Sequence, residues 1–206
     1  MKHKNLLTLL AGVLAGILYI MGGNMVTERY WPVDRDGTET AQTASVTPGE
    51  LKGRRILIAY YSWSGTTKGV AEGIQKEVGG DLYVIEPSES YAGSHGEVSK
   101  RAKKEQDEKY RPKLKNPLPD MERYDVVFLG YPIWWYQEPM VVDSFLEKNR
   151  WEGKIVVPFC TSGGSTIDRS VGNIIRETPG ATVLKGITLV NGRGQDVKEW
   201  LVSNGF

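Results

Sequence analysis

Short apolar runs alternate with segments of helical pattern after residue 54, and this alternation constrains the fold more than any other feature of the sequence. The runs are rich in Ile, Val, Leu and aromatic residues, and they cover 56–61, 82–85, 125–129, 155–159 and 183–190. Helices are expected at about 66–78, 95–110, 139–149, 167–177 and 195–203. Continuous apolar runs are typical of strands buried on both faces of a parallel sheet. The pattern therefore predicts a doubly wound α/β fold with five strands.

The expected helix at 95–110 carries a heavily charged face. Glu97 precedes Arg101 by four residues, and Glu105 precedes Lys109 by the same spacing, which suits ion pairs along a helix. We interpret this charge as a solvated surface.

Composition excludes several kinds of site. Among 206 residues, 26 basic and 25 acidic side chains leave a net charge of +1, which gives no electrostatic basis for binding nucleic acid. Cys160 is the single cysteine, so an internal disulfide and a cysteine-built metal site are excluded. His3 and His95 are too few for a histidine cluster. The groups that remain for a functional site are hydroxyls, backbone amides, aromatic rings and a bound cofactor, and no metal is expected.

Residues 1–27 are expected to form a signal anchor. Lys2 and Lys4 precede an uncharged stretch of 23 residues, which as a helix would be about 34 Å long against a hydrocarbon core of about 30 Å. The positive-inside rule then places the remainder on the extracytoplasmic side of the cytoplasmic membrane, as a single-pass protein. The stretch lacks the small-residue pair of a cleavage site, which favours an anchor over a cleaved signal peptide and a secreted protein.

Residues 28–53 are expected to form a flexible linker, followed by a globular domain at 54–206. Between residues 32 and 53 the chain is rich in Thr, Ala and Gly and has no aromatic residue. Such a composition is typical of a tether.

The loop after the first expected strand suits a phosphate group. It reads Ser62, Trp63, Ser64, Gly65, Thr66 and Thr67. Four hydroxyls and a glycine surround a helix N-terminus, where unpaired amides and the helix dipole favour a phosphate without a basic side chain. The loop lacks the Gly-Lys-Ser/Thr of a Walker A motif and the three spaced glycines of a dinucleotide fingerprint. Alternatively, Ser64 or Thr66 simply caps the helix.

The loops after the third and fourth expected strands complete a candidate site, because ligands of doubly wound sheets bind at the carboxyl ends of strands. The second loop includes Pro132, Ile133, Trp134, Trp135 and Tyr136. Consecutive aromatic side chains suit a flat ring system, although at least one of them could instead plug the core or form a dimer contact. The third loop reads Thr161, Ser162, Gly163, Gly164 and Ser165. It offers backbone amides at close approach, or it is only a flexible turn.

Together these loops would hold a phosphate at one end and a planar ring at the other, as flavin mononucleotide (FMN) requires. From about residue 55 to 206 the chain resembles the flavodoxin-like family, and within it the bacterial flavodoxin branch with a Pro-Ile-Trp-Trp loop. The resemblance implies strand order 2-1-3-4-5 and FMN as cofactor. It also implies a phosphate site at 62–67 that includes Trp63, a ring site at 132–135, and contacts from 161–164 to the pyrimidine side. The Thr-x-Gly-Gly pattern of the third loop is also similar to that of NAD(P)H quinone reductases.

The sequence departs from these relatives in ways that leave the function open. Flavodoxins are typically strongly acidic, which this chain is not. The tyrosine and histidine that follow the Gly-Gly loop of quinone reductases are replaced by Thr166, Ile167 and Asp168. One interpretation is hydride transfer from NAD(P)H to a quinone-like small molecule. The alternatives are a one-electron carrier between redox partner proteins and a non-redox binding module. The sequence identifies neither the donor, the acceptor nor the oligomeric state.

Overall fold

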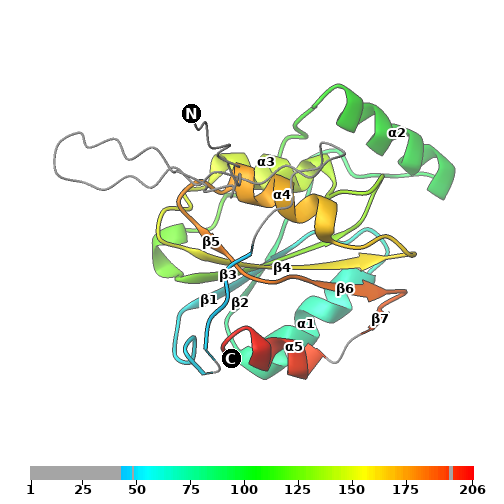
Figure 1. The fold of residues 1–206 in the computed structure, drawn as a ribbon. Helices are drawn as coiled ribbons and strands as arrows, with labels where there is room; N and C mark the ends of the chain where they lie inside the picture. Colours follow the sequence, from blue (N-terminus) through cyan, green and yellow to red (C-terminus); the bar gives the residue numbers. More distant parts are fainter. Residues whose placement is uncertain (1–42, 48, 195–196) are drawn as a thin grey trace, which may run out of the picture. The chain divides into compact units, whose positions relative to one another are not determined.

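A computed structural model describes residues 43–47, 49–194 and 197–206. Its central sheet follows the order β2-β1-β3-β4-β6 (Figure 1). The strands are β1 (Ile56–Tyr60), β2 (Asp81–Val84), β3 (Val126–Pro132), β4 (Ile155–Ser162), β5 (Thr182–Val183), β6 (Ile187–Val190) and β7 (Arg193–Gly194). Strands β5 and β6 both pair with β4 in parallel, β5 at its start and β6 at its end, and together form the fifth strand. The predicted parallel sheet with order 2-1-3-4-5 is therefore confirmed, and the short β7 adds an antiparallel edge.

The fifth strand, predicted as one run over 183–190, is interrupted opposite Pro158. The Val156 carbonyl accepts a hydrogen bond of 2.8 Å from the Leu184 amide, so β4 faces the fifth strand at this residue. Backbone groups alternate in direction along a strand, and Pro158 consequently faces the fifth strand as well. Because proline has no N–H, the ladder cannot continue there, and pairing resumes at Ile187.

Helices cover both faces of the sheet (Figure 1). They are α1 (Thr66–Val78), α2 (His95–Asp107), α3 (Met140–Lys148), α4 (Asp168–Glu177) and α5 (Val197–Ser203), with a 3₁₀ turn, η1, at Met121–Arg123. In Figure 1, α1 and α5 lie on one face, and α3 and α4 lie on the other. Each face has its own hydrophobic core, because alternate residues of the buried strands point to opposite sides. The expected helices are all present, with ends that differ from prediction by a few residues.

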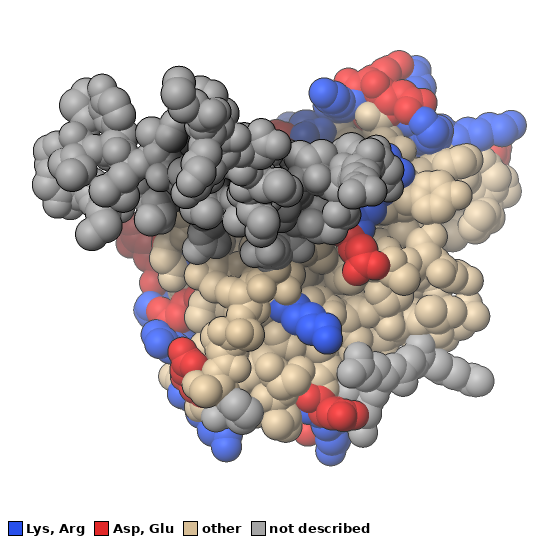
Figure 2. Space-filling view, in the orientation of Figure 1, with Lys and Arg blue, Asp and Glu red and all other residues tan. Residues whose placement is uncertain are grey.

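Helix α2 is more deeply integrated than its charge suggests. Figure 2 shows basic and acidic side chains mixed over this helix. Glu105, however, is buried: its carboxylate accepts 2.5 Å from the Tyr91 hydroxyl and 2.8 Å from Arg101 Nε. Glu97 bonds to Ser94 in a capping box. The expected partners of both glutamates are thus replaced, and the charged face is only partly a solvated surface.

The end of the segment expected to be a linker packs on the domain. The Ala44 amide donates to the Val183 carbonyl at 2.8 Å, and the Leu51 amide donates to the Gly205 carbonyl at 2.9 Å. Leu51 is 1% exposed and belongs to the core that contains α1 and α5. The folded unit therefore begins before residue 54.

None of the helices in the described ranges combines the length and the apolar content needed to span a membrane. The expected anchor at 1–27 and the linker up to residue 42 lie outside the described residues.

Candidate functional site

The first loop presents an uncapped helix N-terminus. Gly65 precedes α1 with φ of 89°, a left-handed conformation that favours glycine, and no side chain caps the helix. Ser64 Oγ lies 3.1 Å from Thr66 Oγ1, and both residues are exposed. The alternative in which Ser64 or Thr66 caps α1 is therefore not what the structure shows. Ser62 has a different task, since its hydroxyl accepts from the Gly65 amide at 3.1 Å and shapes the turn.

The hydroxyl of Thr67 points away from this exposed surface. Thr67 is buried, and its Oγ1 lies 2.8 Å from Thr161 Oγ1 at the end of β4. This hydrogen bond ties the first loop to the third. The hydroxyls left at the surface for a ligand in the first loop are therefore those of Ser64 and Thr66.

The second loop contains a tight turn at Trp135 and Tyr136. The amide of Trp134 donates to the Gln137 carbonyl at 2.8 Å, and the reverse bond measures 3.2 Å. Between them, Trp135 and Tyr136 have φ of 49° and 71°. Two-residue turns of this type prefer glycine or asparagine, so two aromatic residues here are strained. Such strain is found preferentially at functional sites.

Helix α2 holds the strained turn in place. The indole Nε1 of Trp135 donates to the Ser99 carbonyl at 2.9 Å, and Gln106 Nε2 donates to the Trp135 carbonyl at 3.3 Å. The side chains of Trp135 and Tyr136 remain 43% and 59% exposed. The turn therefore lies at the surface, held in place by α2, and its side chains do not fill the core.

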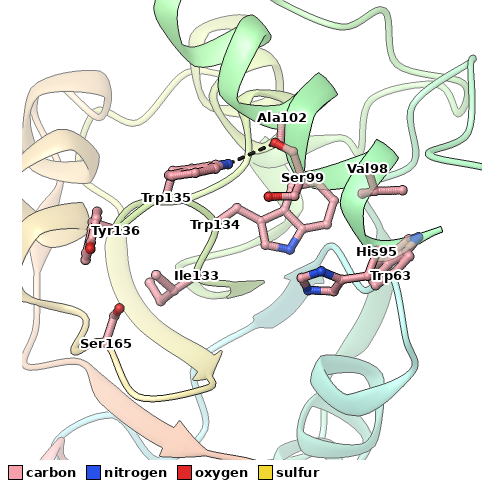
Figure 3. Close-up of a pocket in the computed structure, with 10 residues that line it drawn as sticks. All are labelled: Trp63, His95, Val98, Ser99, Ala102, Ile133, Trp134, Trp135, Tyr136 and Ser165. Atoms are coloured by element: carbon pink, nitrogen blue, oxygen red, sulfur yellow. Dashed lines mark hydrogen bonds between the residues drawn. The ribbon is translucent and has the colours of Figure 1, made fainter. Parts of the chain in front are cut away.

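A pocket of about 310 Å³ lies between α2 and the three loops (Figure 3). Aromatic and small side chains line it: Trp63, His95, Val98, Ser99, Ala102, Ile133, Trp134, Trp135, Tyr136 and Ser165. Flat apolar walls with a few polar groups are typical of a site for a planar ligand.

Trp134 forms the back of this pocket and joins it to the core. Its ring centroid lies 5.0 Å from that of Tyr91 and 5.5 Å from that of Tyr61, both in edge-to-face contact. Trp63 lies 6.3 Å away, and its Nε1 donates to the Tyr91 carbonyl at 2.9 Å. Burial raises the pKa values of Tyr61 and Tyr91 well above the ordinary range of tyrosine, so both phenols stay neutral. One of the consecutive aromatics, Trp134, is therefore partly a core residue, as the sequence allowed.

The third loop lies beside the second at the same edge of the sheet. The Thr161 carbonyl accepts from the Ile133 amide at 2.8 Å, and Ser162 Oγ accepts from the Gly164 amide at 3.0 Å. Gly163 and Gly164 are exposed, and a Cβ added to either would meet no atom within 4 Å. The backbone of this loop therefore borders open space where a ligand can approach.

The structure thus gathers the predicted residues at one edge but divides their tasks. Trp63, Ile133, Trp134 and Trp135 line the pocket. The first and third loops border it, with Ser64, Gly65, Thr66, Gly163 and Gly164 exposed, Thr67, Thr161 and Ser162 buried, and Ser62 half-buried. In the second loop, Pro132 is half-buried. Their contact with FMN stays a prediction.

Sequence reasoning missed the wall that α2 contributes. His95, Val98, Ser99 and Ala102 all come from this helix. A signal was present, because Val98, Ala102 and Glu105 recur at helical spacing and are all buried. The many charged residues of α2 make this buried stripe difficult to recognise in the sequence.

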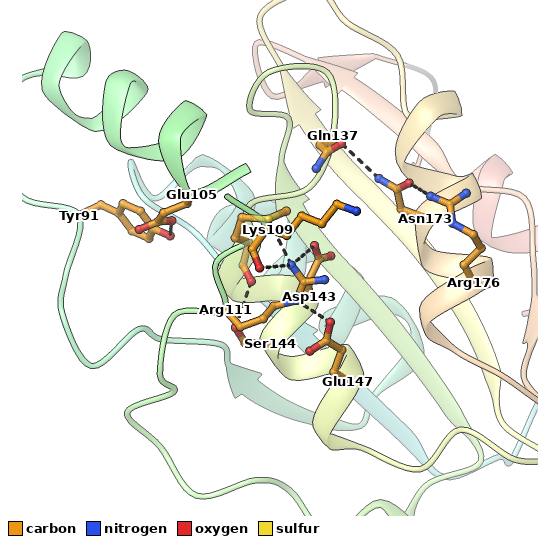
Figure 4. A network of polar contacts seen from close by, with 11 residues as sticks. Tyr91, Glu105, Lys109, Arg111, Gln137, Asp143, Ser144, Glu147, Asn173 and Arg176 are labelled. Atoms are coloured by element: carbon orange, nitrogen blue, oxygen red, sulfur yellow. Dashed lines mark hydrogen bonds and ion pairs between the residues drawn. The ribbon is translucent and has the colours of Figure 1, made fainter. Parts of the chain in front are cut away.

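Two buried acids lie behind the second loop. Glu138 is 1% exposed, and neither of its carboxylate oxygens makes a hydrogen bond in the described part of the chain. Burial and the neighbouring carboxyl of Asp143 raise its pKa well above the ordinary range, and burial also raises the pKa of Asp143. Arg111 opposes this from one side, 3.6 Å from Asp143 and 2.6 Å from Glu147 (Figure 4). Burial therefore favours the neutral form of the Glu138 carboxyl.

Comparison with known proteins identifies the family to which this fold belongs. A family model described as Flavodoxin matches residues 55–204. The chain belongs to the flavodoxin family. Comparison with curated proteins finds no significant match.

Several solved structures are similar to this flavodoxin-family chain. A protein from Bacteroides eggerthii described as a flavoprotein shares 37% identity with a TM-score of 0.66, covering 72% of this chain and 96% of its own. One from Bacteroides uniformis shares 34% identity with a TM-score of 0.66, covering 73% and 99%. A flavoprotein from Lactobacillus acidophilus, solved in complex with FMN, shares 26% identity with a TM-score of 0.59, covering 72% and 99%.

Proposed function

We propose that this protein is an FMN-dependent redox protein that takes hydride from NAD(P)H and passes it to a quinone-like acceptor. FMN is the cofactor, as supported by membership of the flavodoxin family and by the Lactobacillus acidophilus relative solved with FMN. The observation that carries the proposal is the uncapped N-terminus of α1, with two exposed hydroxyls, at the edge where the aromatic pocket lies.

The residues present fit this cofactor. The hydroxyls of Ser64 and Thr66 and the free amides of α1 would hold the phosphate, because a helix N-terminus favours a dianion. Trp63, Ile133 and Trp134 would flank the ring. Bound FMN supplies the hydride chemistry, and the protein supplies position and the exclusion of water.

Removal of the phosphate ligands tests the site. In Ser64→Ala/Thr66→Ala, two hydroxyls are lost, each expected to make a charge-assisted bond of about 1.5–3 kcal/mol, or at least about tenfold in affinity. The dissociation constant for FMN, measured by flavin fluorescence, should rise strongly while that for riboflavin, which has no phosphate, changes little. Thr182→Ala, an exposed threonine at the opposite end of the sheet, is the matched control. Equal losses for the two ligands would contradict a phosphate site here.

The backbone of the second loop favours two-electron chemistry over a one-electron carrier. The Ile133 amide is bonded to Thr161, and both the amide and the carbonyl of Trp134 are bonded to Gln137. A peptide beside the flavin that turns over to stabilise single-electron reduction would have to break these bonds at non-glycine positions, which costs about 1–3 kcal/mol. We therefore expect anaerobic titration of the FMN-loaded protein to reduce the flavin in a single two-electron step. Accumulation of a one-electron species would favour the carrier between redox proteins.

We further propose that residues 1–27 anchor the domain on the extracytoplasmic side of the cytoplasmic membrane. Lys2 and Lys4 ahead of an uncharged stretch support this orientation. Protease added to intact spheroplasts should degrade the domain. Complete protection, with the protein in the soluble fraction, would contradict the proposal.

A further inference from the structure

The pocket contains an imidazole to which no role has yet been assigned. His95 is the first residue of α2 and lines the pocket beside Trp63 (Figure 3). Imidazole is the side chain best suited to give and take a proton near neutral pH. Reduction of a carbonyl needs a proton as well as a hydride, so this group has a chemical use in such a pocket.

Neighbouring residues fix the position of His95 from two sides. Its ring centroid lies 6.0 Å from that of Trp63 in edge-to-face contact, and the Trp63 indole is itself bonded to Tyr91. The start of α2 is fixed by a capping box, in which the Ser94 amide donates 2.8 Å to Glu97 Oε2 and the Ser94 hydroxyl accepts from the Glu97 amide. The capping box therefore positions the backbone of His95, and the Trp63 ring packs against its imidazole.

Both ring nitrogens of His95 lack a hydrogen-bond partner among the described residues. Within the described part of the chain, the imidazole makes no hydrogen bond or ion pair. Two indoles of the wall are already hydrogen-bonded: that of Trp63 donates to Tyr91, and that of Trp135 donates to Ser99. The rest of the α2 wall is formed by Val98, Ala102 and Ser99, of which only Ser99 has a polar side chain. Because a serine hydroxyl is a much weaker acid than an imidazole, His95 is the group of the α2 wall suited to donate a proton to the carbonyl oxygen of a flat acceptor.

We propose that His95 donates the proton that completes reduction of the acceptor, an inference that rests on the proposed function. Bound FMN would supply the hydride, that is two electrons and one proton drawn from NAD(P)H, that reduces the quinone. The quinone is reduced to a quinol monoanion. The N–H bond of the His95 imidazolium breaks, a new O–H bond forms on the quinol oxygen, and the neutral imidazole recovers its proton from water. His95 is thus a catalytic residue of the acceptor half-reaction and has no part in holding the phosphate.

The test compares His95→Gln with the wild-type protein, both loaded with FMN, using menadione as the acceptor. Loss of a general acid typically lowers a rate by about 100-fold or more. For the wild type, kcat/KM for menadione, measured over a range of pH values, should vary with pH because a side-chain acid donates the proton. His95→Gln should show the low rate at all these pH values, while its FMN affinity and its rate of reduction by NAD(P)H stay unchanged. His3→Gln, the same change at the other histidine of the sequence, is the matched control.

Two further readouts separate proton donation from a structural role. Added imidazole should restore menadione reduction in His95→Ala but have no effect on the wild type. In proton NMR spectra of the oxidised, FMN-loaded protein, menadione should shift the ring resonance that His95→Gln lacks. Identical pH profiles and rates in wild type and His95→Gln would overturn the role of His95 and leave the proposed function intact. Failure of the FMN-loaded wild type to reduce menadione would instead overturn both.

Discussion

Adjacent threonines in the first loop lie in different environments and have different tasks. The hydroxyl-rich loop was predicted as a unit, but Thr66 is exposed while Thr67 is buried against Thr161. Helical spacing explains the difference, because Thr67, Ala71 and Ile74 form the buried stripe of α1. That stripe is readable in the sequence. The hydrogen bond of Thr67 to Thr161 could not be predicted, because Thr161 lies on a strand that only the fold brings close.

A substitution at Thr67 should therefore affect stability before it affects the ligand. Thr67→Val keeps the volume but leaves Thr161 Oγ1 buried without its partner, which costs about 1–3 kcal/mol. Urea unfolding of the protein without FMN should show this loss, and Thr67→Ser, which keeps the hydroxyl, should lose less. A valine variant as stable as the wild type, but unable to bind FMN, would show that the hydroxyl of Thr67 serves the phosphate directly.

At the scale of elements, periodicity predicted all five strands and five helices because buried runs and helical stripes are local patterns. It did not predict how α2 closes the pocket. That wall depends on long-range contacts, such as the bond from Trp135 to Ser99, and on the burial of Glu105 by Tyr91 and Arg101. The strained turn was equally hidden, since nothing local in Trp135 or Tyr136 favours a positive φ.

The buried acids behind the second loop make a prediction about pH. Because the pKa of Glu138 is raised in the folded protein, the folded state binds more protons than the unfolded state once pH exceeds about 4, the ordinary carboxyl range. The protonated buried acids therefore stabilise the folded state fully in acid. This stabilisation is lost as pH rises, by up to about 1.4 kcal/mol per pH unit for each proton.

Replacement of Glu138 isolates this effect. Glu138→Gln removes the titrating group beside Asp143, while Arg111 continues to pair with Asp143. The free energy of unfolding, measured from mildly acidic to mildly alkaline pH, should therefore fall less steeply in Glu138→Gln than in the wild type. Glu122→Gln, at an exposed site, should keep the wild-type slope. Parallel curves for all three proteins would mean that Glu138 is ionised in the folded state.

At the scale of the whole molecule, the sequence placed the start of the domain too late. The segment at 43–53 looks like a tether because its few apolar residues stand among Thr, Gly and Pro. Its partners, Val183 and Gly205, lie more than a hundred residues away, where no local pattern can reveal them. The segment joins the sheet beside the start of β4, whereas the pocket lies at the end of β4. The segment therefore packs at the end of the sheet opposite the site.

This arrangement predicts that stability and ligand binding can be separated by a change at Leu51. Truncation of a fully buried leucine leaves a cavity and costs about 2–5 kcal/mol, so Leu51→Ala should lower the free energy of unfolding by an amount in that range. The FMN affinity of the folded protein should stay at the wild-type value, because the site is at the other edge of the sheet. Lys52→Ala, at the exposed neighbour, is the matched control and should change neither quantity. If Leu51→Ala unfolded at the same urea concentration as the wild type, the segment would be a tether after all, and the folded unit would begin at residue 54 as the composition indicated.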